Sequence, residues 1–126
     1  MVEDDRLLRM DLALVLGREG FELDEACSAK EAFDLLEHHC YAIVLTDVKL
    51  PDRSGFEVLD AAKRSDPATK VVLVSCSHAV SSVGDADLHG AETMILKPFA
   101  LAELLATVRR VMSSGPSHAA PKHPGA

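Results

Sequence analysis

Apolar residues follow two spacings along the chain, the helical spacing of three to four residues and the short continuous runs typical of buried strands. The first helical stripe lies within residues 6–18, and Gly20 ends it. A short strand is predicted over residues 21–27. Ser28 and Glu31 then form a capping box, which predicts that a second helix begins there.

Strand and helix patterns continue to alternate through the rest of the chain. The run at 41–46 is continuous rather than alternating, so it is predicted to be a strand buried on both faces. The later predicted elements are a helix opened by a capping box at 54–57, strands at 71–74 and 94–96, and a helix at 101–112. This alternation predicts an α/β fold, in which a parallel sheet carries helices on both faces.

The start of the predicted sheet is unusual. A strand should precede the first helix, but only Met1 and Val2 come before the acidic run at residues 3–5. We therefore expect a truncated first strand. A missing strand exposes unpaired backbone groups, so we expect reduced stability or a homodimer that fills the gap.

Two segments carry weaker patterns. Residues 77–89 contain Gly84, Asp85 and several serines, so a helix there would be short and poorly supported. The last residues, 113–126, are rich in Ser, Pro, His, Gly and Ala, which predicts a disordered tail or linker stub. The sequence thus predicts one domain over residues 1–112.

The composition and charge of the chain argue against several classes of function. The formal net charge of −7 argues against binding of nucleic acid or an anionic membrane by this domain. No apolar run is long enough to span a membrane, and no signal peptide is visible, so we expect a cytoplasmic protein. The cysteines are three in number, widely spaced and without a CxxC pair, which argues against a disulfide framework or a zinc site.

Four chemical features follow predicted strands: the acidic run 3–5, Asp47, Ser75 and Lys97. Because the carboxyl ends of parallel strands meet at one edge of a sheet, these side chains can converge there. Oxygen ligands of this kind suit Mg²⁺, and a lysine supplies a fixed positive charge for a phosphoryl group. Ser75 can donate a hydroxyl hydrogen bond to that group, and Asp47 can act as a nucleophile that forms an acyl phosphate.

The set of motifs resembles the response-regulator receiver domain of two-component signalling, over residues 1–112. The motifs that carry the resemblance are Val2–Asp5, Thr46–Asp52, Val74–Ser75, Gly90–Ala91 and Lys97–Phe99. The resemblance implies a flavodoxin-like, doubly wound, five-stranded parallel sheet with strand order 2-1-3-4-5 and, in this chain, a truncated first strand. Each residue alone also fits an ordinary structural role, such as a turn residue or a helix cap.

By the same resemblance, Asp47 is the phosphoacceptor. Glu3 and Asp4 match the acidic pair that binds Mg²⁺ together with Asp47 and the backbone carbonyl of Lys49. Ser75 matches the switch hydroxyl that reads the new charge.

Lys97, by the same comparison, matches the lysine that pairs with the phosphoryl group. The implied partners are a sensor histidine kinase or histidine phosphotransfer protein and an output partner that the sequence does not name. Such a domain is a signalling phosphoacceptor rather than an ordinary enzyme, although it catalyses its own phosphotransfer and slow autodephosphorylation.

Two alternatives remain open at this stage. Met94 stands three residues before Lys97, where the family usually has an aromatic residue, so the chain could be a non-phosphorylated pseudo-receiver that acts as an interaction module. A phosphohydrolase with an aspartyl nucleophile usually carries a second Asp two positions after the first. Here that position is Lys49, which disfavours the hydrolase.

Overall fold

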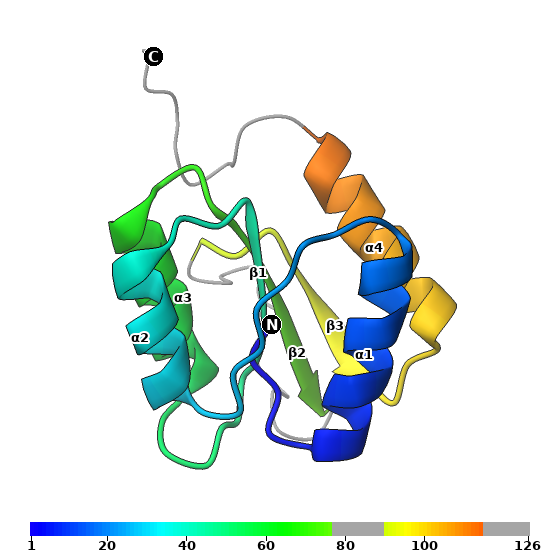
Figure 1. The fold of residues 1–126 in the computed structure, drawn as a ribbon, viewed down its shortest axis with the longest axis horizontal. Helices are drawn as coiled ribbons and strands as arrows, with labels where there is room; N and C mark the ends of the chain where they lie inside the picture. Colours follow the sequence, from blue (N-terminus) through cyan, green and yellow to red (C-terminus); the bar gives the residue numbers. More distant parts are fainter. Residues whose placement is uncertain (77–89, 115–126) are drawn as a thin grey trace.

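A computed structural model of the chain describes residues 1–76 and 90–114. Its helices and strands are α1 (Arg6–Arg18), α2 (Ala29–His38), β1 (Ile43–Asp47), α3 (Gly55–Ser65), β2 (Lys70–Cys76), β3 (Thr93–Lys97) and α4 (Leu101–Ser113). The sheet lies between two helical layers, with α2 and α3 on one face and α1 and α4 on the other (Figure 1). The weak helix considered over 77–89 lies outside the described residues, as do residues 115–126 of the predicted tail. The tail was predicted to begin at residue 113, which is wrong, because Ser113 is the last residue of α4 and Ser114 is its C-cap.

The sheet is parallel, with strands in the order β1-β2-β3. Val2 extends this order by one position, because it forms isolated parallel bridges with Thr46 of β1 on one side and with Ala26 on the other. The spatial order is therefore Ala26, Val2, β1, β2, β3, which confirms the predicted order 2-1-3-4-5. The first strand is reduced to a single bridged residue, as expected for a truncated strand.

The strand predicted over residues 21–27 is not formed over that length. Ala26 alone pairs, with its N–H donating to the carbonyl of Met1 at 2.8 Å and its carbonyl accepting from Glu3 at 3.0 Å. A ladder extends only as far as its shorter member, and the facing segment offers just the residues around Val2. Within the described residues the sheet therefore has three strands and two single-residue bridges, in place of five full strands.

Helix starts follow the sequence closely. Ser28 and Ser54 are the N-caps of α2 and α3, and their hydroxyls accept from the backbone N–H groups of Glu31 and Phe56, respectively. The α1 boundaries agree with the range predicted from the apolar stripe. These caps fix where the chain turns back across the sheet after each strand.

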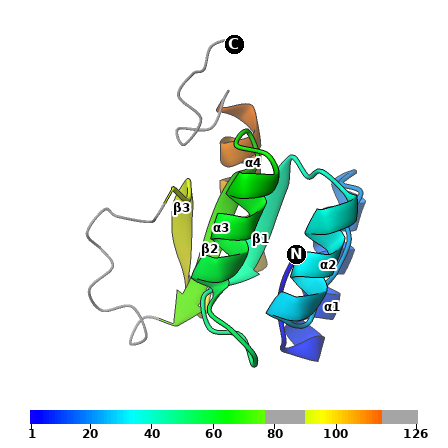
Figure 2. The ribbon, with the colours of Figure 1, turned by 90° about the vertical axis from the view of Figure 1, so that its left-hand side faces the viewer.

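The core consists of two apolar clusters, one on each face of the sheet. Side chains alternate along β2, so that Val71 and Leu73 pack in the cluster under α2 and α3 while Val72 and Val74 pack in the cluster under α1 and α4. Figure 2 looks at the sheet face-on, with α2 and α3 in front of the strands and α1 and α4 behind them. A central strand that is buried on both faces explains why 71–74 reads as a continuous apolar run.

Helix α1 is apolar on its outer side as well as its inner side. Leu12 and Leu16 are buried, whereas Leu7, Met10 and Leu14 are 73%, 53% and 54% exposed. These three exposed residues, spaced i, i+3 and i+7, form a stripe that we call the outer stripe of α1. The helical spacing within residues 6–18 does not by itself distinguish these exposed positions from the buried ones.

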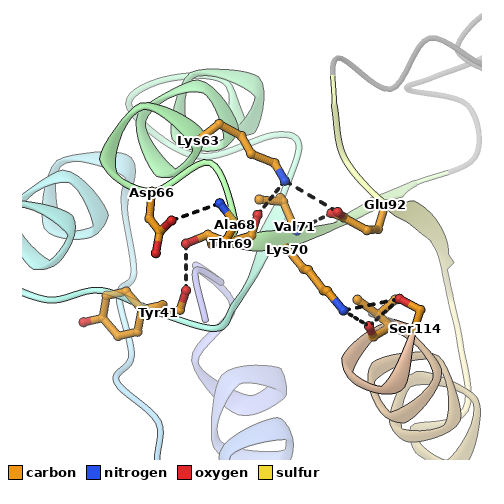
Figure 3. A network of polar contacts seen from close by, with 10 residues as sticks. Tyr41, Lys63, Asp66, Ala68, Thr69, Lys70, Val71, Glu92 and Ser114 are labelled. Atoms are coloured by element: carbon orange, nitrogen blue, oxygen red, sulfur yellow. Dashed lines mark hydrogen bonds and ion pairs between the residues drawn. The ribbon is translucent and has the colours of Figure 1, made fainter. Parts of the chain in front are cut away.

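A polar network holds the end of the sheet opposite to the strand carboxyl ends (Figure 3). Nζ of Lys70 donates to the carbonyl of Val111 at 2.8 Å and to Oγ of Ser114 at 3.3 Å, so a buried cation satisfies the C-terminus of α4. Lys63 of α3 pairs with Glu92 at 3.5 Å.

Glu92 also accepts from the backbone N–H of Val71 at 2.7 Å. The network thereby ties α3 and the segment before β3 to β2, while Lys70 ties α4 to the same strand.

Among the described helices, none is long and apolar enough to cross a membrane.

Candidate functional site

Three charged side chains that the sequence singled out meet at the carboxyl edge of the sheet. Asp47 is the last residue of β1, Lys97 is the last residue of β3, and Glu3 directly follows the bridged Val2. Nζ of Lys97 lies 3.2 Å from Oε1 of Glu3 and 3.3 Å from both carboxylate oxygens of Asp47. The predicted convergence of these groups at one edge is therefore present.

Asp47 is buried beside a second carboxylate, which disfavours its charged form. Glu3 and Asp47 are only 2% and 4% exposed. Burial raises the pKa of Asp47 to about 8. A hydrogen bond that protonated Asp47 donates to Glu3 and the negative charge of Glu3 act in the same direction, while Lys97 opposes this shift. Oδ1 of Asp47 is buried and accepts no hydrogen bond from the described residues, although Nζ of Lys97 is 3.3 Å away. One lysine does not compensate the carboxylates gathered here.

Lys97, unlike Asp47, has its charged form favoured by the site. Burial by itself would lower the pKa of Lys97, but the nearby carboxylates of Asp47 and Glu3 outweigh it, and the net shift is upward. Lys97 is therefore a firmly held cation at the edge of the sheet. Such a group suits the recognition of a phosphoryl oxygen next to Asp47.

The acidic groups also fit a divalent cation. Glu3, Asp4 and Asp47 each offer a carboxylate oxygen, and these oxygens lie within 4.8 Å of one another. Glu3 and Asp47 are buried, whereas Asp4 is exposed and leaves the site open to solvent. A set of oxygen donors with excess negative charge and room for water matches the coordination preferences of Mg²⁺.

Gly55, the first residue of α3, sets the position of Asp47. A Cβ atom at Gly55 would lie 1.8 Å from the carbonyl oxygen of Asp47, so only glycine permits this approach. The N–H of Gly55 also donates to the carbonyl of Val48 at 2.6 Å. The sequence placed Gly55 at the start of a helix, but its contact with Asp47 appears only in the structure.

Asp52 anchors the loop that follows β1. Its two carboxylate oxygens accept from the backbone N–H groups of Ala29 and Lys30, each at 2.9 Å. These N–H groups belong to the first turn of α2, where such donors otherwise lack partners. They hold the pKa of Asp52 below its ordinary value. From the sequence, Asp52 was identified only as the end of the motif Thr46–Asp52. Its contact with α2 could not be predicted, because the two are far apart in sequence.

We expect Asp52→Ala to destabilise the domain and to loosen the loop that carries Lys49. The lowered pKa of Asp52 means that its contribution to stability is present above its ordinary pKa and is lost as the pH falls through the folded value. The stabilities of wild type and variant in urea unfolding should therefore differ at pH 7, and the difference should shrink as the pH falls below 3.8. A difference that does not shrink in this way would contradict the proposed role of the carboxylate.

The other predicted residues lie near the edge without joining the charged cluster. Ser75 is buried in β2, and its hydroxyl donates to the carbonyl of Cys76 at 3.2 Å. Lys49 lies in the loop two residues after Asp47, is exposed, and forms an isolated bridge with Ser54. Met94 is partly buried and packs against the core cluster under α2 and α3. The ligand role of the Lys49 carbonyl and the switch role of Ser75 stay predictions.

Curated bacterial proteins are similar to this chain in sequence. The chain is 37% identical over 113 residues to the transcriptional regulatory protein PmrA of Pectobacterium parmentieri, covering 89% of this chain and 50% of PmrA. It is 35% identical over 116 residues to the transcriptional regulatory protein PdtaR of Mycobacterium tuberculosis, covering 90% of this chain and 55% of PdtaR. The chain thus spans about half the length of these curated relatives.

Solved structures share the fold. The non-phosphorylated receiver domain of HemR from Leptospira biflexa matches with a TM-score of 0.82 and 26% identity, over 93% of this chain and 94% of that one. The response regulator TrrA of Thermotoga maritima, solved in complex with Mg²⁺ and BeF, matches with a TM-score of 0.73 and 28% identity, over 87% and 94% of the two chains. The family model of the response regulator receiver domain matches residues 1–109, and the chain belongs to that family.

Proposed function

We propose that this domain is a phosphoacceptor switch that takes a phosphoryl group onto Asp47 with Mg²⁺ bound. The proposed donor is a phosphohistidine of a sensor kinase or of a histidine phosphotransfer protein in the cytoplasm. The observation that carries the proposal is the buried Asp47 carboxylate, which lies 3.3 Å from Lys97 and beside the oxygens of Glu3 and Asp4. A nucleophile, a phosphate-binding cation and a metal-binding pair are thereby joined at one edge.

The chemistry follows from these positions. A carboxylate oxygen of Asp47 attacks phosphorus, an O–P bond forms, and the N–P bond breaks with its electron pair passing to the imidazole nitrogen. Mg²⁺, when bound, neutralises charge on the phosphoryl oxygens. Glu3, Asp4, Asp47 and the carbonyl of Lys49 are the groups that would hold it. Water attacking the acyl phosphate later returns Asp47 to its carboxylate form.

Lys97 and Ser75 would change their hydrogen-bond partners when Asp47 is phosphorylated. Lys97 now pairs with Glu3 and Asp47, so a phosphoryl group on Asp47 offers it additional oxygen partners. The hydroxyl of Ser75 would have to leave the carbonyl of Cys76 to reach the phosphoryl group. Such a change at the ends of β2 and β3 is the proposed output signal, passed to a partner that is not yet known.

The outer stripe of α1 is the proposed contact surface for the donor protein. It begins at Leu7, two residues beyond Asp5 and the acidic run of the site, and it leaves three large apolar side chains in solvent. Exposed apolar patches of this kind commonly mark protein interaction sites. A donor bound along this stripe would have its histidine close to Asp47.

The complex of TrrA with Mg²⁺ and BeF supports the proposal, since that homologous structure binds the metal. For this chain, the test is incubation with acetyl phosphate and Mg²⁺ followed by intact mass measurement. Wild type and the exposed-site control Asp60→Asn should gain the mass of one phosphoryl group. Asp47→Ala should gain none, and chelation of Mg²⁺ should prevent labelling of wild type. Equal labelling of Asp47→Ala would overturn the assignment.

A second candidate function is a non-phosphorylated interaction module. Two observations favour it: Met94 occupies the aromatic position as a packed core residue, and Ser75 is engaged with Cys76. Titration with Mg²⁺ and beryllofluoride separates the two functions. A phosphoacceptor should shift the amide signals of Ser75 and Met94 in NMR spectra, whereas an interaction module should show no change at either residue.

A further inference from the structure

The peptide bond that joins Glu3 and Asp4 lies just past the last backbone hydrogen bonds of the sheet in this segment. Val2 pairs through both of its backbone groups with β1, since its N–H donates to Leu45 and its carbonyl accepts from Asp47. On the other side, the ladder runs from the carbonyl of Met1 through Ala26 to the N–H of Glu3. In a parallel ladder the next donor, for the carbonyl of Glu3, would be the N–H of Ser28.

Ser28 does not continue that ladder, because it is the N-cap of α2. The carbonyl of Glu3 accepts instead from the Arg9 guanidinium of α1, at 2.9 Å. Nε of Arg9 lies 3.5 Å from Oε1 of Glu25, and the Arg9 side chain is 19% exposed. The arginine therefore joins α1, the residues after Val2 and the segment before Ala26.

We propose that Arg9 is a positioning residue for the Mg²⁺ site, because its hydrogen bond to the carbonyl of Glu3 takes the place of strand pairing at the Glu3–Asp4 peptide. The proposal rests on the function proposed above. Fixing the carbonyl of Glu3 fixes the plane of the peptide that links the two acidic residues. The Glu3 carboxylate is also held directly, because it accepts from the N–H of Asp5 at 2.9 Å and pairs with Lys97. The direction of the Asp4 carboxylate relative to Asp47 then depends on the guanidinium rather than on a sheet ladder.

The ion pair with Glu25 cannot itself account for the role of Arg9. Glu25 is half exposed, with 43% of its side chain accessible, and exposed ion pairs contribute little. The bond to the carbonyl of Glu3 is partly buried and satisfies an acceptor that the sheet does not reach. The main-chain bond, rather than the ion pair with Glu25, is therefore the contact through which Arg9 shapes the site.

The test compares Arg9→Gln with Arg6→Gln, which removes the same charge from an exposed position on the same helix. Mg²⁺ is titrated into ¹⁵N-labelled protein well below the unfolding temperature, and affinity is followed at the amides of Asp4 and Asp47. We expect Arg9→Gln to weaken Mg²⁺ binding about tenfold, a typical loss when a group that orients metal ligands is removed. Arg6→Gln and Glu25→Gln should stay within about twofold of wild type.

A second measurement needs no metal. In Mg²⁺-free protein, the heteronuclear NOE at the Asp4 amide should fall in Arg9→Gln and stay unchanged in Arg6→Gln. Arg9→Lys keeps the charge and one donor, so it should restore part of both signals. Wild-type affinity in Arg9→Gln, or equal losses in Arg9→Gln and Arg6→Gln, would overturn the positioning role. If wild type itself fails to bind Mg²⁺, the proposed function fails, and an unchanged Asp4 amide in Arg9→Gln would then overturn the role of Arg9 separately.

Discussion

Gly55→Ala is expected to lower the free energy of unfolding by about 3 kcal/mol or more, the upper range for overpacking in a rigid setting. The new methyl group would stand 1.8 Å from the carbonyl oxygen of Asp47. Both sides of this clash are backbone, so no side chain can rotate away to relieve it. Either α3 or the end of β1 must move, and a shift of β1 would also displace the Asp47 carboxylate from Lys97.

Gly17→Ala supplies the matched control. Gly17 lies within α1, and a Cβ atom there meets nothing within 4 Å. Because alanine favours a helix more than glycine does, this change should stabilise the domain by about 0.5–1 kcal/mol. Urea unfolding measures both variants, and acetyl phosphate labelling of the folded fraction reports on the site. Equal stability of Gly55→Ala and wild type would show that α3 can move away from Asp47 at little cost.

The elements of the fold were predictable because their signals are local. A continuous apolar run marks a strand buried on both faces, and this holds for β1 and β2, which lie in the middle of the sheet. Serine caps mark the starts of α2 and α3. The convergence of Asp47 and Lys97 followed from topology alone, since parallel strands present their carboxyl ends at one edge.

What escaped prediction depends on contacts between distant segments. The outward direction of Leu7 could not be read from a helix that is apolar on both sides. The hydrogen bond between Asp52 and the first turn of α2 joins positions 23 residues apart, and no local sequence pattern predicts it. The strand expected over residues 21–27 failed for a related reason: its own composition was adequate, but its partner offered too few residues to pair with.

Asp47→Asn is expected to stabilise the metal-free protein, and by more at high pH than at low pH. Folding raises the pKa of Asp47 from 3.8 to about 8, so the folded state binds more protons than the unfolded state between those values. Wild-type stability must therefore fall as the pH rises through this window, relative to a variant that cannot ionise. We expect the two proteins to match near pH 4 and the difference to grow with each pH unit above it, reaching several kcal/mol by pH 8.

Mg²⁺ should reverse the stability advantage of Asp47→Asn over wild type. This reversal would link the unfavourable ionisation of Asp47 to its proposed role as a metal ligand. The metal binds the folded wild type and raises its stability by mass action, whereas Asp47→Asn loses a ligand and should gain less. Urea unfolding from pH 4 to pH 8, with and without Mg²⁺, measures both effects, and the exposed control Asp60→Asn should follow wild type throughout. Parallel pH profiles for wild type and Asp47→Asn would mean that the buried carboxylate is already compensated by Lys97. A widening difference would instead show that the metal-free site carries uncompensated negative charge, which a divalent cation is suited to neutralise.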